Sequence, residues 1–307
     1  MKHAIEYFYN LDFEELLYED DAYHFVINNE HYYFVHYFRS EKDLNDIIEC
    51  SKELKSKKVL CHDILFNIKG EALTKIDDVN YILMKVYDKD KKYNITHIME
   101  LNKKLTISEE KKNKYVNNWA YLWSSKIDYI ENQLSEINVN NIIKNSIDYY
   151  IGLSENAISY VNNISLKYSI SNNDRVTLSH RRIYYPNYGL NYLNPLSFLF
   201  DLEVRDISEY IKHCFFYNDE ENDASEELST YLKSNKLTIY SYNMLFARLL
   251  FPSYYFDIYE KIVNKNLDSE KLIKIINKVE DYEQFLKKAY KEISSYAPLE
   301  KIKWLIY

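Results

Sequence analysis

The stretch Thr177–His213 reads TLSHRRIYYPNYGLNYLNPLSFLFDLEVRDISEYIKH. Its first part is a short β-branched and apolar run that ends at His180. A second apolar run leads to Asp206, which begins a segment with helical periodicity. The stretch therefore predicts a loop that begins at a histidine, then a short hairpin, and then a helix headed by an aspartate.

The composition is that of a globular protein with a sizeable core. The chain has 307 residues, of which 47% are hydrophobic and 28% are charged. Since single hydrophobic cores stop growing at about 250–300 residues, the length fits two domains or one unit with two lobes. The 33 tyrosines suit half-buried positions wherever they occur, so they identify no binding surface.

Glycine is scarce, which excludes the usual nucleotide-binding loops. Loops that hold phosphate with backbone N–H groups need Gly where the backbone approaches the ligand. Gly70, Gly152 and Gly189 lie far apart, so the chain has neither a P-loop nor a GxGxxG motif. The net charge of −8 also argues against a nucleic-acid partner, which requires clustered basic residues.

The cysteines and the apolar segments predict a reduced, cytoplasmic protein. Cys50, Cys61 and Cys214 are too widely spaced for a disulfide framework or a CxxC metal knuckle. No segment approaches about 18 consecutive apolar residues, so no transmembrane segment is expected. The histidines on the predicted N-terminal strands have no carboxylate spaced to complete a metal site, and we expect no metal.

The N-terminal third predicts a small, mainly antiparallel lobe. Residues 1–40 alternate as strands do, and the polar turn Asn28-Asn29-Glu30 predicts a hairpin. Ser40 and the acidic residues after it predict the start of a helix that extends to Lys57. Two or three further strands are predicted before the end of the apolar run at Tyr87.

The rest of the chain has helical periodicity. Long helical segments are predicted at 111–134, 141–160, 240–263 and 281–294. The change of pattern follows the charged run Asp88-Lys89-Asp90-Lys91-Lys92. We therefore expect a domain boundary there, with an N-lobe at residues 1–90 and a helical C-lobe at residues 91–307.

Four blocks of sequence carry a family resemblance. They are YYIGLSENAISY at Tyr149–Tyr160, LSHRRI at Leu178–Ile183, VRDISEYI at Val204–Ile211 and ARLLFP at Ala247–Pro252. In order and spacing they resemble the spore coat-associated proteins of endospore-forming bacteria, of the YutH and CotS type. Those proteins are similar in turn to aminoglycoside phosphotransferases and choline kinases. The resemblance implies an α+β, bilobal, protein kinase-like fold with one helix inserted in a β-rich N-lobe.

The resemblance also implies which residues occupy the site. Active members of the superfamily use a strand lysine for the phosphates, an HxDxxxxN loop with a catalytic Asp and a metal-binding Asn, and a further Asp for the metal. The lysine position falls at or near His36, and the loop begins at His180. Arg182 replaces the catalytic Asp, Asn187 keeps the metal-binding amide, and Asn194 replaces the second metal carboxylate.

These replacements predict the loss of phosphoryl transfer. Arg182 cannot accept the proton of a substrate hydroxyl, and its fixed positive charge repels Mg²⁺. Two neutral amides without a carboxylate hold Mg²⁺ poorly. We expect His180, Arg205 and Asp206 to form a structural network instead, in which Asp206 caps its helix and pairs with Arg181 or Arg182.

The resemblance and the missing carboxylates together predict a pseudokinase of sporulation. It would act in the mother-cell cytoplasm or the spore coat by binding coat or other sporulation proteins, without a cofactor. The alternative is an enzyme that uses the same inter-lobe cleft, either an atypical small-molecule phosphotransferase or a nucleotidyl transferase that needs ATP and Mg²⁺. Its carboxylates would come from Asp201, Glu203, Asp63 or Glu155. The oligomeric state stays open.

Overall fold

A computed structural model describes residues 1–19, 22–88, 93–104, 118–183, 192–217, 223–265 and 267–306. The chain divides into two compact units. The first unit joins Met1–Leu105 to Leu178–Leu199, and the second joins Thr106–Thr177 to Phe200–Tyr307. Because the first unit includes a segment from the middle of the chain, the lobe limits expected from the sequence, 1–90 and 91–307, stay a prediction.

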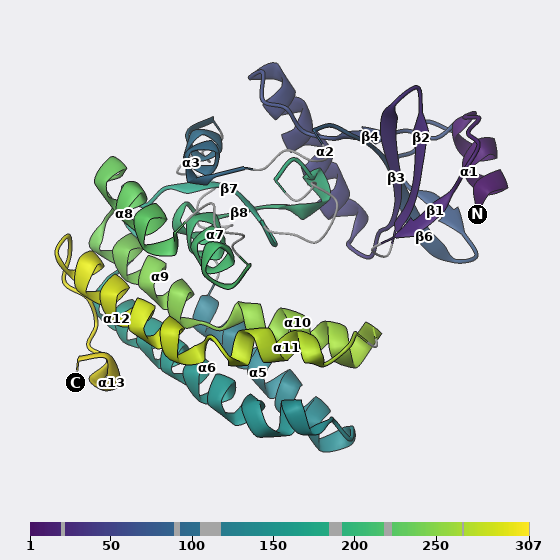
Figure 1. Ribbon diagram of the computed structural model, residues 1–307. Helices are drawn as coiled ribbons and strands as arrows, with labels where there is room; N and C mark the ends of the chain where they lie inside the picture. The colour runs from purple at the N-terminus through teal and green to yellow at the C-terminus, as the bar shows by residue number, and fades with distance from the viewer. Residues whose placement is uncertain are drawn as a thin grey trace. The chain divides into compact units, whose positions relative to one another are not determined.

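A six-stranded antiparallel sheet forms the centre of the first unit (Figure 1). Its strands are β1 (Leu17–Glu19), β2 (Ala22–Ile27), β3 (Glu30–His36), β6 (Val79–Val86) and β4 (Asp63–Leu65) in spatial order, and β5 (Thr74–Ile76) also pairs with β6. The predicted hairpin is confirmed, because β2 and β3 pair as far as Ile27 and Glu30. Asn28 and Asn29 turn the chain with φ of 51° and 63°, which Asn tolerates better than most residues.

Helices cover the two faces of this sheet. The predicted helix after the hairpin is α2 (Glu41–Ser56), and the hydroxyl of Ser40 accepts a hydrogen bond from Asp43 N at 3.1 Å, as an N-cap does. Leu44 of α2 belongs to the core cluster on one face, and Ile5 of α1 (Lys2–Tyr9) belongs to the cluster on the other. Figure 1 shows α1 and α2 on opposite sides of the strands.

Helix α1 corrects the prediction that all of residues 1–40 form strands. The aromatic N-terminus fits both the helical and the strand period. The tertiary contact selects the helix, because Ile5 is completely buried against the sheet. The helix ends at Asn10, which has a left-handed φ of 51°. The first unit also contains α3 (Ile95–Lys104).

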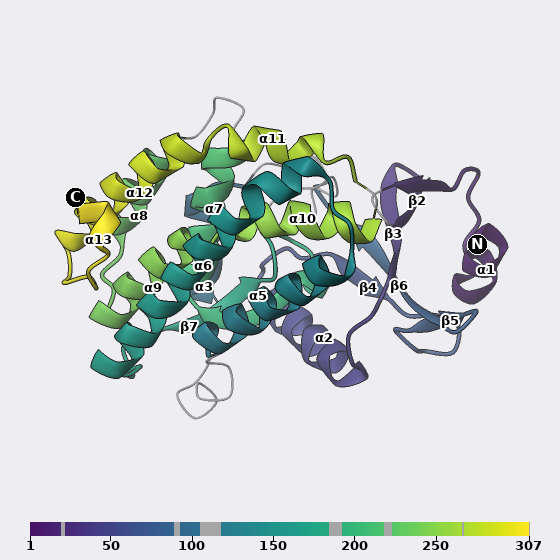
Figure 2. The ribbon, with the colours of Figure 1, turned by 90° about the horizontal axis from the view of Figure 1, so that it is seen from below.

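The second unit is helical. Its helices are α5 (Trp119–Glu136), α6 (Asn141–Lys167), α7 (Val204–Tyr217), α8 (Ala224–Ser234), α9 (Ile239–Leu250), α10 (Ser253–Lys265), α11 (Glu270–Ile276), α12 (Val279–Ser294) and α13 (Lys303–Ile306). Figure 2 shows α5 and α6 side by side. Helix α9 packs against both α6 and α7 and is buried from Tyr240 to Leu250, so it forms the centre of this unit.

Two predicted helices differ from the structure. The single helix expected at 240–263 is divided into α9 and α10 at Phe251-Pro252, because proline lacks the N–H that would continue the first helix. The helix expected at 111–134 is described from Trp119 onward, where Asn118 caps it by accepting from Tyr121 N at 3.1 Å. Residues 111–117 of that prediction lie outside the described residues.

Candidate functional site

The His180 loop begins in the first unit. Strands β7 (Val176–His180) and β8 (Phe198–Leu202) form a two-stranded sheet, and the loop lies between them in sequence. His180 is completely buried, and its Nε2 lies 2.9 Å from the carbonyl oxygen of Tyr192. Because a carbonyl only accepts, Nε2 carries the proton. The rings of His180 and Tyr192 also stack, with 5.6 Å between their centres. His180 thus holds the two ends of the loop together.

Arg182, at the position predicted for the catalytic aspartate, is held close to its own backbone. Its Nη1 donates to the carbonyl oxygen of Arg181 at 2.8 Å, and its own carbonyl accepts from Ser197 Oγ at 3.3 Å. Arg181 N in turn donates to Ser197 O at 2.8 Å. These bonds join the start of the loop to Ser197, the residue before β8. Asn187, the predicted metal-binding amide, lies outside the described residues.

Asn194 acts as a cap in this structure. Its side-chain oxygen accepts from Leu196 N at 2.9 Å and begins the short 3₁₀ helix η1 (Pro195–Ser197). The oxygen that would face a metal ion is therefore already an acceptor within its own turn. The assignment of Asn194 to a cofactor stays a prediction.

His36 is exposed at the end of β3. Its ring lies 5.9 Å from the rings of Phe38 and Tyr81, and Tyr81 packs with the core cluster on the α1 side of the sheet. The neighbouring side chains of Val35 and Tyr37 pack with the cluster on the α2 side. His36 therefore points away from α2, and its role in holding phosphate stays a prediction.

Arg39 is a site residue that sequence reasoning missed. Its Nη1 lies 3.3 Å from each of the carbonyl oxygens of Leu196 and Phe198, which are 157 and 159 positions away. Leu196 also packs against the core cluster on the α2 side. These contacts attach the 178–199 segment to the N-terminal part of the chain. A single arginine in a polar stretch carries no sequence signal for so distant a partner.

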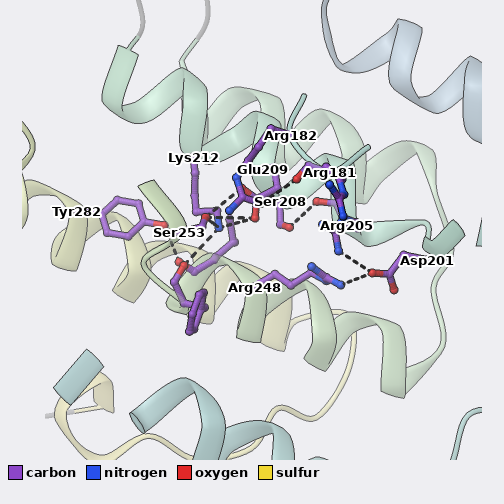
Figure 3. A network of polar contacts seen from close by, with 12 residues as sticks. Arg181, Arg182, Asp201, Arg205, Ser208, Glu209, Lys212, Arg248, Ser253 and Tyr282 are labelled. Carbon is purple, nitrogen blue, oxygen red and sulfur yellow. Dashed lines mark hydrogen bonds and ion pairs between the residues drawn. The ribbon is translucent and has the colours of Figure 1, made fainter. Parts of the chain in front are cut away.

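In the second unit, Asp201 lies between two arginines (Figure 3). Its Oδ2 accepts from Arg205 at 2.9 Å and from Arg248 at 2.7 Å, while Oδ1 accepts from Trp119 Nε1 at 3.3 Å and Leu202 N at 2.7 Å. Asp201 is 1% exposed and the two arginines are 6% and 3% exposed. We call this group the Asp201 clamp. The Asp201 carboxylate thus accepts hydrogen bonds from four donors.

The indole of Trp119 completes the clamp. The guanidinium carbons of Arg205 and Arg248 lie 4.8 and 4.1 Å from the centre of a Trp119 ring, within the range of cation–π attraction. Burial lowers the pKa of Arg248, and the neighbouring Asp201 opposes that change. Arg248 stands in the apolar run MLFARLLF, so the sequence did signal a buried charge that needs a partner.

Glu203 has a cation of its own. Arg175 donates to both carboxylate oxygens of Glu203, from Nε to Oε1 at 3.0 Å and from Nη2 to Oε2. The backbone repeats the link, because Glu203 N donates to Arg175 O at 3.1 Å. Burial raises the pKa of Glu203, and the bonds from Arg175 only partly oppose it. This bidentate pair fixes the end of β8 to the segment before β7.

A second buried network joins three helices. Lys212 Nζ of α7 donates to Glu209 Oε1 at 2.7 Å, to Ser253 Oγ at 2.5 Å and to the carbonyl oxygen of Phe251 at 3.3 Å (Figure 3). Ser253 Oγ donates to Glu209 Oε2 at 3.0 Å. Lys212 is 2% exposed and Glu209 is 6% exposed. The network ties α7 to the junction between α9 and α10 through the buried side chains of Lys212 and Glu209.

The predicted structural network of His180, Arg205 and Asp206 stays a prediction. Arg205 is bound to Asp201, and Asp206 is completely buried in the first turn of α7. The expected links from Asp206 to Arg181 or Arg182 also stay predictions. Among the described residues, no group of three or more His, Cys, Asp and Glu side chains is arranged to hold a metal ion.

The remaining candidate carboxylates lie elsewhere. Asp63 accepts hydrogen bonds from Lys55 and, at 2.5 Å, from Tyr87. Burial raises the pKa of Asp63, but these two bonds outweigh burial and leave its pKa below the ordinary value of 3.8. Glu155 is exposed on α6. The structure therefore engages Asp201, Glu203 and Asp63 with basic side chains.

The fold is that of the aminoglycoside phosphotransferases, as the sequence predicted. An aminoglycoside phosphotransferase from Alicyclobacillus acidocaldarius aligns with a TM-score of 0.65 at 8% identity, over 96% of each chain. Spectinomycin phosphotransferase in complex with ADP and spectinomycin aligns with a TM-score of 0.55 at 10% identity, over 94% of this chain and 92% of that one. The α+β, bilobal, protein kinase-like fold class is confirmed.

The chain belongs to the family described as "Spore coat putative kinase YutH", whose model matches residues 2–289. It is 30% identical over 212 residues to the endospore coat-associated protein YutH of Bacillus subtilis (strain 168), and this match spans 62% of each protein. The predicted family is thereby confirmed. Within the described ranges, no helix has the length and apolar character needed to cross a membrane.

Proposed function

We propose that this member of the spore coat family is a pseudokinase that binds coat or other sporulation proteins and transfers no phosphate. It would work in the mother-cell cytoplasm and become part of the coat. The observation that carries the proposal is the Asp201 clamp. A carboxylate that could hold Mg²⁺ is bound instead by two buried arginines.

The residues at the other predicted positions support the same reading. Arg182 is a permanent cation where a general base is needed. Asn194 uses its side-chain oxygen to cap η1. Mg²⁺ prefers carboxylate oxygens and water in octahedral geometry, so the described donor set does not suit a Mg·ATP complex. We assign no chemical step to this chain.

Nucleotide binding is the first test of this proposal. Thermal unfolding of the purified full chain is measured with and without Mg·ATP, with the Alicyclobacillus phosphotransferase as the positive control. A ligand at about 100 times its Kd would stabilise the native state by about 2.7 kcal/mol, and we expect no such shift here. A shift, together with transfer of labelled γ-phosphate to any coat protein, would contradict the pseudokinase proposal.

Protein binding is the second test. The immobilised chain is incubated with coat extract from sporulating cells, and each retained protein is then purified and titrated against the chain by calorimetry. We expect at least one coat protein to bind saturably in the absence of nucleotide. If no purified candidate binds, the proposed docking role fails whatever the outcome with Mg·ATP.

A further inference from the structure

We propose that the outer side of helix α5 binds a partner protein through an arginine that lies between Tyr121 and Tyr129. Because an α-helix turns by about 100° per residue, Ser125 stands at the centre of the outer side, with Tyr121 one turn before it and Tyr129 one turn after it. The opposite side is buried and is formed by Ala120, Trp123, Ile127 and Ile130. We call Tyr121, Ser125, Asp128 and Tyr129 the α5 face. The inference rests on the proposed docking role and names the chemistry of the partner.

Large side chains are exposed along α5. Tyr121 is 67% exposed, Leu122 is 41% exposed and Tyr129 is 52% exposed. The rest of the second unit contacts other sides of the helix, because α5 packs along α6, and Lys126 Nζ donates to Glu260 Oε1 of α10 at 2.8 Å. Exposed apolar and aromatic side chains are ordinary when they are scattered singly, whereas several on one face are typical of an interaction site.

The space between the two tyrosines suits a guanidinium group. Tyr121 and Tyr129 are eight positions apart in the sequence, which corresponds to about 12 Å along the helix axis. Long side chains on a helix lean in the same direction, so the two rings keep about this spacing. Ser125 is exposed between them, and its short side chain leaves the space open. A cation midway between the rings lies about 6 Å from each, within the reach of cation–π attraction.

The charge of α5 favours a cation at this position. Asp128, Glu131 and Glu136 are exposed, and none of them forms an ion pair with a described residue. The single lysine of the helix, Lys126, already pairs with a carboxylate of α10 at 2.8 Å. The helix therefore keeps an excess of three negative charges. Asp128 follows Ser125 by three residues, so it lies beside Ser125 on the helix surface and can pair with the guanidinium.

Arginine fits the α5 face better than lysine. The planar guanidinium can stack on an aromatic ring and donate to a carboxylate at the same time, whereas the ammonium of lysine is a compact and strongly hydrated point charge. Tyrosine and arginine are also the residues that, with tryptophan, carry most of the binding energy in protein interfaces.

The arginine comes from a different protein. The arginines of this chain are engaged with its own carbonyls or carboxylates, as is seen for Arg39, Arg175, Arg182, Arg205 and Arg248. Arg181 also has a partner within the chain. A second copy of the chain would have to break one of these contacts to reach the α5 face.

The experiment measures the binding of fluorescein-labelled, blocked peptides to the full chain by anisotropy. The probe is AARLAARLAARA, whose arginines recur every four residues on one side of a helix, as the positions of Tyr121, Ser125 and Tyr129 do. One control peptide has lysine in place of each arginine, and the other has citrulline, which is uncharged and similar in shape.

We expect saturable binding of the arginine peptide, binding about threefold weaker or less for the lysine peptide, and no binding of the citrulline peptide. No binding of the arginine peptide would overturn the inference. Equal binding of the lysine peptide would show a general charge attraction, and equal binding of the citrulline peptide would show apolar contact alone. Either result would also overturn it.

Paired tyrosine variants then locate the binding site. Tyr121→Ala with Tyr129→Ala should weaken binding of the arginine peptide by about tenfold, which corresponds to about 1.4 kcal/mol. The matched control is Tyr7→Ala with Tyr18→Ala, at rings that are 69% and 64% exposed on α1 and β1. The control should bind as the parent chain does, and an equal loss in both pairs would contradict the α5 face.

Two further variants test the position of the arginine. Ser125→Arg places the chain's own guanidinium between the rings and should abolish binding, while Ser294→Arg, at an exposed serine of α12, should not. Asp128→Asn should weaken binding by about threefold, while Asp46→Asn, at an exposed position of α2, should leave it unchanged. Binding that survives Ser125→Arg would contradict the proposed position.

The same variants separate this inference from the docking role itself. If a coat protein binds all of the α5 variants as tightly as the parent chain, the α5 face is refuted and the docking role stands. Concentration-dependent dimers that Tyr121→Ala with Tyr129→Ala abolishes would identify a second copy of the chain as the occupant and overturn the inference.

Discussion

Arg248 of α9 donates to Asp201 of β8 at 2.7 Å, although the two residues are 47 positions apart in the chain. Both side chains are almost completely buried, and Arg205 binds the same carboxylate oxygen at 2.9 Å. A buried ion pair gains little over apolar packing, but breaking it is costly, because the remaining charge has no solvent around it. The Asp201 clamp is therefore a structural requirement of the helical unit.

Removal of the carboxylate should destabilise the protein strongly. Asp201→Asn removes the anion that binds both buried guanidinium groups, and we expect the free energy of unfolding to fall by about 3–5 kcal/mol. Urea denaturation followed by circular dichroism measures the change. The control is Glu53→Gln, in an exposed i, i+4 pair with Lys57, which should change stability by less than about 1 kcal/mol. Similar losses in both variants would contradict the importance of the clamp.

Lys212 and Glu209 should be strongly coupled. Lys212→Met alone leaves the Glu209 carboxylate buried at 6% exposure, so we expect a loss of about 3–5 kcal/mol. The double variant with Glu209→Gln removes both charges, and it should recover part of that loss. A double-mutant cycle from urea denaturation gives the coupling energy, which we expect at about 1–3 kcal/mol. Additive losses would show that the two side chains act independently.

Two carboxylates should affect stability in opposite directions as pH changes. The pKa of Glu203 is raised by burial. The stability that this group contributes to the folded state is therefore fully present below the ordinary pKa of 4.5 and is lost as pH rises through the raised pKa. Asp63 has a lowered pKa, so its contribution is present above 3.8 and is lost as pH falls through the folded-state pKa.

Glu203→Gln should therefore gain stability relative to the parent chain as pH rises from acid to neutral. Asp63→Asn should be less stable at neutral pH and approach the parent chain in acid. Urea denaturation of both variants and the parent across this range measures the differences. The same slope for both variants would contradict the opposite pKa shifts.

Substitutions of Asn29 in the β2–β3 turn should change the stability according to whether the new residue tolerates a positive φ. Asn29 has a φ of 63°, where an L side chain costs about 1–2 kcal/mol and glycine costs nothing. We expect Asn29→Gly to raise the melting temperature, whereas Asn29→Val should lower the stability by about 1–2 kcal/mol. Thermal unfolding compares the two variants at the same position. A stabilising valine would contradict the left-handed turn.

Local patterns predicted the elements whose signals lie within a few residues. The Asn28-Asn29 turn, the Ser40 cap and the helical periods of α6 and α12 are all found where they were expected. Helix α1 was missed because its aromatic run suits both periods and the burial of Ile5 decided the outcome. The division of 240–263 was missed although Pro252 was visible, because the apolar pattern continues across it.

The sequence by itself determined the family resemblance and the β-rich and helical parts of the chain, and it led to the prediction that Arg182 stands where the family has a catalytic aspartate. These properties depend on residue identity and short spacing. Only the tertiary structure decided that Asp201 is bound by Arg205 and Arg248, and that Arg39 reaches carbonyls more than 150 positions away. The physical reason is that a buried charge needs a partner, and that partner comes from a segment that is distant in the sequence and close only in the folded chain. Local sequence patterns carry no information about such distant partners.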